Sequence, residues 1–122
     1  MRCVGPTLAH QEIAAIRKSL EFAPELEEAA ELFNLASNST RLKILFLLDR
    51  LEELCVCDLA EMLGVSVSAV SQHLAKLRAY GLTTTRRDAQ TIYYRLSDHE
   101  FLEKLQGSFF AEMETAFLSI GS

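Results

Sequence analysis

The chain has 122 residues, the size of one domain, and its 49% hydrophobic and 24% charged residues are ordinary for a soluble globular protein. No apolar run approaches the roughly 18–20 residues that span a bilayer, and the N-terminus lacks the apolar stretch of a signal peptide, so we expect a cytoplasmic protein with no membrane partner. The net charge of −5 is unusual for a nucleic-acid-binding protein taken as a whole, and three cysteines, an odd count, argue against a disulfide framework.

Helices are expected throughout the N-terminal part of the chain. Residues 1–8 are interpreted as a mobile arm. Apolar residues at helical spacing predict an amphipathic helix over 9–22, and Pro24, which suits a first helical turn, begins a second helix. Residues 40–50 are strongly apolar and predict a central core helix, capped by the serine or threonine at its start.

The next two helices are joined by the tight turn LGVS. The first is short and ends at Gly64, a residue type that commonly terminates helices. The second spans 65–80 and ends at Gly81. Two helices joined in this way, here over 57–80, are typical of a helix-turn-helix.

The hydrophobic period changes after this pair of helices. Residues 82–87 and 91–96 are rich in β-branched and aromatic residues and flank a polar link, which predicts a two-stranded hairpin with Arg86 and Arg87 at its tip. A positive hairpin after a recognition helix is typical of a wing, here 82–96, that lies over the DNA backbone. The alternative is that the arginines keep an edge strand soluble.

The last segment, 98–120, predicts an amphipathic helix with a capping box from Ser97 to Glu100 and a bend at Gly107. The expected fold is therefore mainly α-helical with a two-stranded β-hairpin. We interpret residues 1–122 as a single winged helix-turn-helix domain. A dimer that buries its terminal helices would add core to a chain of this size.

Charge and side-chain type indicate a DNA-binding surface on the second helix of the pair and on the hairpin. Residues 66–96 carry five basic residues against one acidic residue, whereas the segments on either side are net negative. Short and amide side chains on the polar side of this helix suit hydrogen bonds in a major groove. The candidate DNA-binding residues are Ser66, Ser68, Ser71, Gln72, His73, Lys76, Arg78, Arg86 and Arg87.

The other side of this helix is expected to be buried. Its apolar residues recur at helical spacing and form one stripe, made of Val67, Val70, Leu74 and Leu77. His73 borders the stripe, so the sequence favours a half-buried structural role for it as much as contact with DNA.

The segments ELCVCDLAEMLGVSVSAVSQHLAKLRAYGL and RRDAQTIYYRLSD closely resemble the ArsR/SmtB family of metal-sensing winged-helix repressors. The resemblance runs over about residues 28–100. It implies double-stranded operator DNA as a partner and a homodimer paired through the first and last helices. One departure is Ala89, where the family usually has glycine in the turn of the wing.

Cys55 and Cys57 are separated by one residue at the start of the short helix. On a regular helix, residues so spaced point about 200° apart and could not share an ion. If Cys55 is the N-cap, however, its backbone is not helical, and both thiols lie near the positive end of the helix dipole, which favours the metal-binding thiolate. The alternative is that both are small buried apolar residues.

A thiophilic ion needs more than two ligands, and the arm could supply them. The candidate metal ligands are Cys3, His10, Cys55 and Cys57. The resemblance implies that, in the cadmium- and lead-sensing branch, the Cys-Val-Cys pair works with cysteines of the N-terminal arm across the dimer. In the arsenic-sensing branch, a third cysteine often follows the Asp-Leu, where this chain has Ala60. We therefore expect Cd(II), Pb(II) or Zn(II) as the inducer, with As(III) or Sb(III) as the alternative.

Other functions remain alternatives. The family's second zinc site, on the last helix, is not expected, because Glu100 and Ala111 replace its two histidines beside Asp98 and Glu114. A repressor that senses oxidation through the same cysteines, or one that has lost metal sensing, is also consistent with the sequence. No nucleophile–base constellation and no phosphate-binding loop indicates an enzyme.

Overall fold

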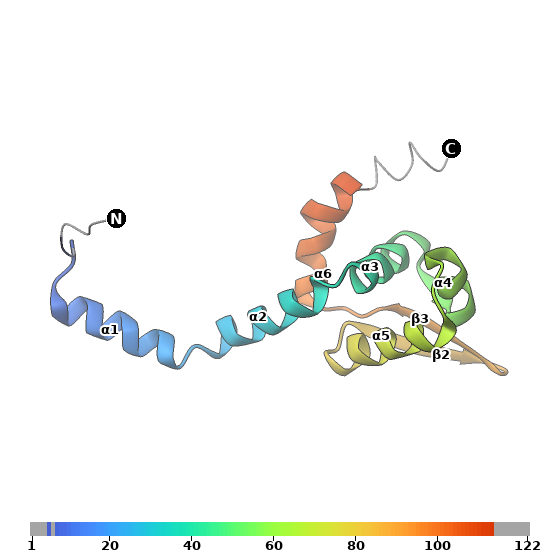
Figure 1. Cartoon of the computed structure of the whole chain (residues 1–122), viewed down its shortest axis with the longest axis horizontal. Helices are drawn as coiled ribbons and strands as arrows, with labels where there is room; N and C mark the ends of the chain where they lie inside the picture. Colours follow the sequence, from blue (N-terminus) through green and yellow to red (C-terminus); the bar gives the residue numbers. More distant parts are fainter. Residues whose placement is uncertain (1–4, 6, 114–122) are drawn as a thin grey trace. The chain divides into compact units, whose positions relative to one another are not determined.

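The computed structural model describes residue 5 and residues 7–113 (Figure 1). The chain divides into two compact units, Met1–Glu31 and Leu32–Ser122. Among the described residues, no helix has the length and apolar character that a membrane span requires. The elements are α1 (His10–Glu21), α2 (Pro24–Ala36), α3 (Ser39–Leu51), β1 (Glu53–Cys55), α4 (Val56–Leu63), α5 (Val67–Ala79), β2 (Thr83–Asp88), β3 (Thr91–Leu96), α6 (Glu100–Lys104) and a π-helical stretch, η1 (Leu105–Phe110).

The first unit contains α1, a helix that the sequence predicted within one residue at each end. Its apolar residues Ile13, Ile16 and Leu20 are 38%, 50% and 57% exposed, and none of the residues of α1 is buried in the described structure. The amphipathic pattern of α1 therefore reflects an apolar face that the rest of its own unit leaves uncovered.

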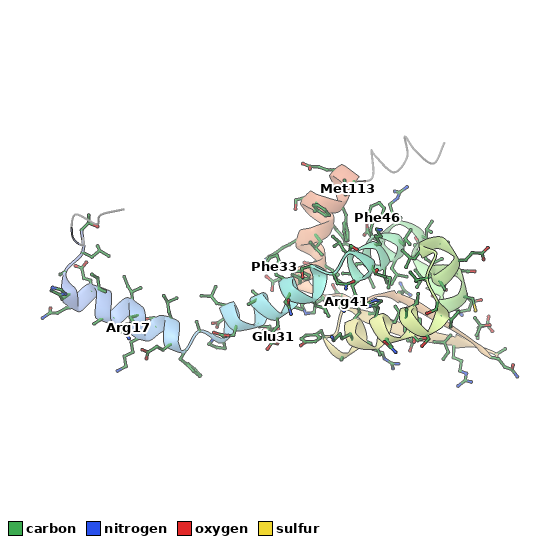
Figure 2. The ribbon with its side chains drawn as sticks, viewed as in Figure 1. Arg17, Glu31, Phe33, Arg41, Phe46 and Met113 are labelled. Atoms are coloured by element: carbon green, nitrogen blue, oxygen red, sulfur yellow. The ribbon has the colours of Figure 1, made fainter. Side chains whose placement is uncertain are left out.

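The core of the second unit lies between α3, the helix-turn-helix and the last helix. Three residues of α3, Ile44, Leu45 and Leu48, are at most 1% exposed. Phe46 of α3, labelled in Figure 2, contacts Phe110 edge-on, with ring centroids 5.6 Å apart. Gln106 donates a hydrogen bond of 2.7 Å to Asp49. The central helix predicted from residues 40–50 is thus confirmed as the element around which the others pack.

The sheet has three strands where the sequence predicted two. The hairpin of β2 and β3 is present, but Glu53–Cys55 forms β1 and pairs antiparallel with β3, so the strand order is β1-β3-β2. Residues 53–55 were expected to lead directly into a helix. A segment of three residues is too short to show the alternating hydrophobic pattern of a strand. Its pairing partner also lies about 40 positions further along the chain. In the sheet, Tyr93 of β3 is opposite Cys55 on one side and Arg86 on the other.

Two of the four helix starts predicted in the second unit are corrected. Asn38 caps α3 by accepting a hydrogen bond of 3.0 Å from the backbone N–H of Arg41, in place of the serine or threonine that follows it. His99 caps α6 by accepting a 3.1 Å hydrogen bond from the backbone N–H of Phe101. The Ser97 hydroxyl, expected to cap this helix, donates instead to the backbone carbonyl of Gly81 and fastens β3 to the end of α5.

The other two starts, and the end of α4, are as predicted. Cys55 is the N-cap of α4, with φ −86° and ψ 166°. Ser66 caps α5 by accepting a hydrogen bond of 3.0 Å from the backbone N–H of Ala69. Gly64 ends α4 with φ 68°, a left-handed conformation that glycine adopts without strain.

The last helix departs from regular geometry after one turn. Residues 105–110 are π-helical and include Gly107, near which a bend was expected, and residues 111–113 return to α-helix. Phe110, in the π-helical stretch, is 2% exposed. The remainder of the predicted helix, to residue 120, lies outside the described residues.

Candidate DNA-binding surface and thiol site

The recognition helix α5 is anchored by three fully buried residues, Val70, Leu74 and Leu77. Val67, which the sequence placed in the same stripe, is 48% exposed, because it lies in the first turn, beyond the part of α5 that the core covers. The candidate DNA-binding residues on the remaining surface of the helix and at its cap are all exposed: Ser66, Ser68, Ser71, Gln72, Lys76 and Arg78. Hydroxyl and amide groups thus occupy the first two turns, and cations follow.

His73 has a defined partner within the protein. Its Nδ1 atom lies 3.4 Å from Nη1 of Arg41, a residue labelled in Figure 2. Nε of Arg41 donates a hydrogen bond of 2.8 Å to the backbone carbonyl of Leu35. Burial, and then the positive charges of Arg41 and Lys76, lower the pKa of His73. A neutral ring that accepts a hydrogen bond from Arg41 links α5 to the corner between α2 and α3, which supports the structural role of His73.

The hairpin of β2 and β3 projects beyond the helices (Figure 1). Arg87 is exposed near its tip, and Nε of Arg87 donates a hydrogen bond of 3.2 Å to the carbonyl of Ala89. Ala89 has φ 57°, which accounts for glycine being the usual residue at this turn in the resembled family. The wing is therefore formed, with its turn in the conformation that glycine would favour.

Arg86 makes contacts that sequence reasoning did not anticipate. Its Nη2 atom lies 2.5 Å from Oε1 of Glu53, its Nε atom lies 3.2 Å from the same oxygen, and its guanidinium lies 4.7 Å from the ring centroid of Tyr93. The hydrogen bond from Arg86 lowers the pKa of the Glu53 carboxyl. No sequence signal pairs Glu53 with a residue 33 positions away, because the contact depends on β1 joining the sheet.

Both cysteines of the Cys-Val-Cys segment are free thiols at the start of α4. Cys55 is half-buried at the N-cap, where its side chain makes no capping hydrogen bond, and Cys57 is exposed in the first turn. The exposure of Cys57 argues against the interpretation of both cysteines as core residues. Two soft donors near the positive end of a helix fit a thiophilic ion.

The other candidate ligands lie elsewhere in the chain. His10 is exposed and begins α1 in the first unit, whose placement relative to the second is not determined, and Cys3 lies outside the described residues. Within residues 5 and 7–113, no group of three or more histidine, cysteine, aspartate or glutamate residues is positioned to hold a metal. Asp98, which precedes α6, and Glu100, its first residue, are exposed, and Glu114 lies outside the described residues.

The second unit also carries an apolar surface between α2 and the last helix. Phe33 of α2 is 63% exposed and contacts Phe101 of α6 edge-on, with ring centroids 5.3 Å apart. Phe109 of η1 is 43% exposed and lines the same shallow hollow. Large aromatic side chains that stay half-exposed together are typical of a protein–protein contact surface.

Comparison with known proteins agrees with this geometry. The family model for the bacterial regulatory protein, arsR family, matches residues 38–85, which run from the cap of α3 into β2. The chain is 49% identical over 86 residues to the nodulation protein NolR of Rhizobium meliloti, covering 67% of this chain and 70% of that protein. It is 34% identical over 94 residues to a homologue of the cadmium resistance transcriptional regulatory protein CadC from Staphylococcus aureus, covering 77% and 76%.

A third relative is the arsenical resistance operon repressor of Escherichia coli strain K12, which is 46% identical over 69 residues. That alignment covers 57% of this chain and 59% of the repressor, so the chain spans somewhat over half of that relative's length.

Two solved structures match over more of the chain than these relatives do. The transcriptional regulator HlyU from Vibrio vulnificus CMCP6 matches with a TM-score of 0.64 and 34% identity, over 84% of this chain and 98% of that chain. The AntR antimony-specific transcriptional repressor matches with a TM-score of 0.66 and 28% identity, over 95% and 97%. From these matches and from its winged helix-turn-helix, the chain belongs to the arsR family of bacterial regulatory proteins and is a DNA-binding transcriptional regulator, not an enzyme.

Proposed function

We propose that this protein is a repressor that binds operator DNA as a homodimer and leaves it when a thiophilic ion binds Cys55 and Cys57. The observation that carries the proposal is the position of these thiols. They stand at the start of α4, the first helix of the helix-turn-helix, and Cys57 is exposed to solvent. An ion bound there would act directly on an element that positions the recognition helix α5.

The DNA-binding surface in this proposal is α5 together with the wing. Ser68, Ser71 and Gln72 read base edges in the major groove, while Lys76 and Arg78 contact phosphates. Ser66 and the first-turn backbone of α5 add a phosphate contact at the helix N-terminus. Arg87, exposed near the tip of the hairpin, contacts the backbone beside the groove. His73 and Arg86 belong to the same surface, although each has a partner within the protein.

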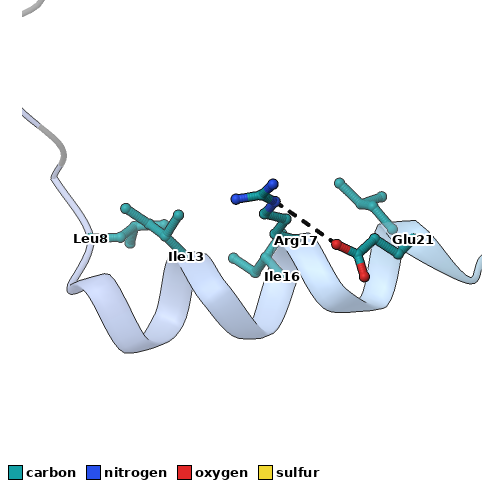
Figure 3. Close-up of a pocket in the computed structure, with 6 residues that line it drawn as sticks. Leu8, Ile13, Ile16, Arg17 and Glu21 are labelled. Atoms are coloured by element: carbon teal, nitrogen blue, oxygen red, sulfur yellow. Dashed lines mark ion pairs between the residues drawn. The ribbon is translucent and has the colours of Figure 1, made fainter.

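The homodimer is supported by two apolar surfaces. Leu8, Ile13 and Ile16 line a hollow on α1, beside an ion pair between Arg17 and Glu21 (Figure 3). In the second unit, Phe33 and Phe109 are exposed between α2 and the last helix. We assign a second copy of the chain to these surfaces, since a two-fold dimer also presents two recognition helices to a symmetric operator.

The ion is proposed to be Cd(II), Pb(II) or Zn(II). Cys3 and His10 complete the ligand set in this proposal, and a nitrogen beside three sulfurs favours Zn(II) or Cd(II), whereas three sulfurs alone suit Pb(II) or As(III). Relatives with cadmium, arsenical and antimony in their names support a thiophilic inducer without selecting one. An As(III)- or Sb(III)-responsive repressor that uses the same cysteines is therefore the nearest alternative.

The sheet offers a route from the ion to the DNA-binding surface. Cys55 ends β1 and pairs with Tyr93 of β3, a strand of the wing, while Cys57 lies in α4, which packs against α5. An ion that links either thiol to the N-terminal arm would shift the positions of both elements that contact DNA, α5 and the wing. Ion and DNA then oppose one another through a reciprocal coupling of about 1–3 kcal/mol, which weakens DNA binding roughly 5- to 150-fold.

The test is operator affinity, measured by fluorescence anisotropy at fixed salt under reducing conditions. The duplex is selected from random-sequence DNA by the metal-free protein, and Cd(II), Zn(II), Pb(II) and As(III) are titrated separately. We expect one ion to weaken binding by the wild type and to leave the double variant Cys55→Ser/Cys57→Ser unchanged. The matched control is Ser68→Ala, which should weaken DNA binding and keep the response to the ion. Metal sensing is wrong if both proteins bind DNA and no ion weakens the wild type.

A redox-responsive regulator is the second candidate, favoured by the exposed, free thiol of Cys57. Peroxide added in the presence of a chelator separates the two proposals. Weaker DNA binding that a thiol reductant restores would support redox control, whereas an unchanged affinity would rule it out.

A further inference from the structure

Three residues from three strands form a continuous cluster on the solvent-facing side of the sheet. Arg86 of β2 reaches across the ring of Tyr93 in β3 and meets the carboxylate of Glu53 in β1. The guanidinium uses Nε and Nη2 on this carboxylate, at 3.2 and 2.5 Å from Oε1. We call Glu53, Tyr93 and Arg86 the sheet clamp.

In the sheet clamp, the guanidinium of Arg86 binds Glu53 and is therefore not available to DNA. A guanidinium bonded to a carboxylate through two nitrogens and stacked on an aromatic ring has its charge neutralised and its direction fixed. Arg87, the next residue, faces the other side of the strand and bonds a turn carbonyl through Nε. The two adjacent arginines are therefore not equivalent, although they look alike in the sequence.

The position of Glu53 in the sheet favours its ion pair with Arg86 over a contact between Arg86 and DNA. The carboxylate is held close by the pairing of β1 with β3, so its contact with Arg86 is intramolecular and needs no second molecule to bring it near. Arg95, opposite Glu53 in the register, adds positive charge beside the carboxylate. The side chain of Arg86 is nevertheless 48% exposed, so a phosphate could reach it if the carboxylate were absent.

We propose that Glu53 is a positioning residue for DNA binding: it holds Arg86 on the sheet and withholds that charge from the DNA phosphates, so that Arg87 makes the phosphate contact of the wing. Operator affinity is consequently lower than it would be if both Arg86 and Arg87 contacted phosphates. The inference rests on the proposed DNA binding by this regulator, and it is tested on the ion-free protein.

The salt dependence of DNA binding tests the clamp directly, because each phosphate contact adds about 0.9 to the slope of log affinity against log salt. Dissociation constants for a selected duplex are measured with a chelator present, from about 50 to 300 mM salt, for the wild type and for Glu53→Gln. We expect Glu53→Gln to bind about two- to fivefold more tightly at about 0.1 M salt and to steepen the slope by about 0.9.

Two further variants make this result specific. The double variant Glu53→Gln/Arg86→Gln should return to the slope of the wild type, because the additional phosphate interaction in Glu53→Gln is made by Arg86. Glu52→Gln, which removes the same charge at the neighbouring exposed residue, should leave the slope unchanged and so controls for the loss of one negative charge. Thermal unfolding of each variant establishes that it is folded.

An unchanged slope in Glu53→Gln would overturn the proposal, since Arg86 would then already contact a phosphate or never reach one. Weaker binding by a folded Glu53→Gln would overturn it as well, because the clamp would then assist DNA binding. An equal steepening in Glu52→Gln would attribute the effect to net charge and overturn it too. Failure of the wild type to bind any selected duplex would instead overturn the proposed function itself, so the two failures are distinguishable.

Discussion

The helix-turn-helix and the sheet beside it both belong to the proposed DNA-binding surface. Their structures, however, depend on different kinds of contact: local ones in the helices and distant ones in the sheet. In α4 and α5, the signals that set the structure lie within about one turn of the residues they affect: the left-handed Gly64, the Ser66 cap and the stripe from Val70 to Leu77. In the sheet, the contacts that bring in β1 join residues 33 or more positions apart, as in the ion pair between Glu53 and Arg86. Local signals can be recognised in sequence because their partners are near; a strand of three residues has no such signal.

The largest expected effect lies in the helix-turn-helix. Leu74→Ala removes a side chain that is 0% exposed, so we expect the free energy of unfolding to fall by about 2–5 kcal/mol through lost burial and the cavity left behind. Urea unfolding followed by circular dichroism measures it.

Val67→Ala is the matched control, because the sequence placed both residues in one buried stripe and the structure leaves Val67 48% exposed. Val67→Ala should lower the free energy of unfolding by less than about 1 kcal/mol. Equal costs for the two variants would mean that α5 is buried as the sequence pattern suggested.

A smaller effect of opposite sign is expected in the wing. Ala89 has a left-handed φ of 57°, so Ala89→Gly should relieve strain and stabilise the protein by about 0.5–1 kcal/mol, net of the extra chain entropy of glycine. The readout is the midpoint of thermal or urea unfolding.

Gln90→Gly provides the comparison within the same turn, since Gln90 is not among the described residues with positive φ. It should be neutral or destabilising. Stabilisation by both changes, or by neither, would contradict the assignment of strain to Ala89.

The smallest expected effect concerns the contact between α3 and α5. Burial, with Arg41 and Lys76, lowers the pKa of His73 in the folded protein, whereas the unfolded chain has the ordinary value of about 6.5. The unfolded state therefore binds the proton first on acidification, so the contribution of His73 is constant above about pH 6.5 and stability is lost as pH falls through that value.

Urea unfolding at about pH 7.5 and 5.5 checks this sign, with His73→Gln as the reference that cannot titrate. The wild type should lose more stability between the two pH values than the variant does. An equal loss in both proteins would show that His73 does not titrate differently on folding.

Some features of this protein depend on residues that are close in sequence, and others depend on residues that are far apart in sequence. The sequence alone determined the order of the helices and hairpin, the caps at Cys55 and Ser66, three of the four buried positions predicted in α5 and the family, because these depend on neighbours along the chain. It placed both thiols at the start of α4 for the same reason.

The tertiary structure decided what depends on distant partners. Pairing with β3 made residues 53–55 a third strand, a hydrogen bond to Gly81 took Ser97 away from its expected capping role, and the sheet clamp separated Arg86 from Arg87. Each outcome follows from one physical fact: a backbone or charged group bonds to whatever folding brings close, and sequence spacing does not report that proximity.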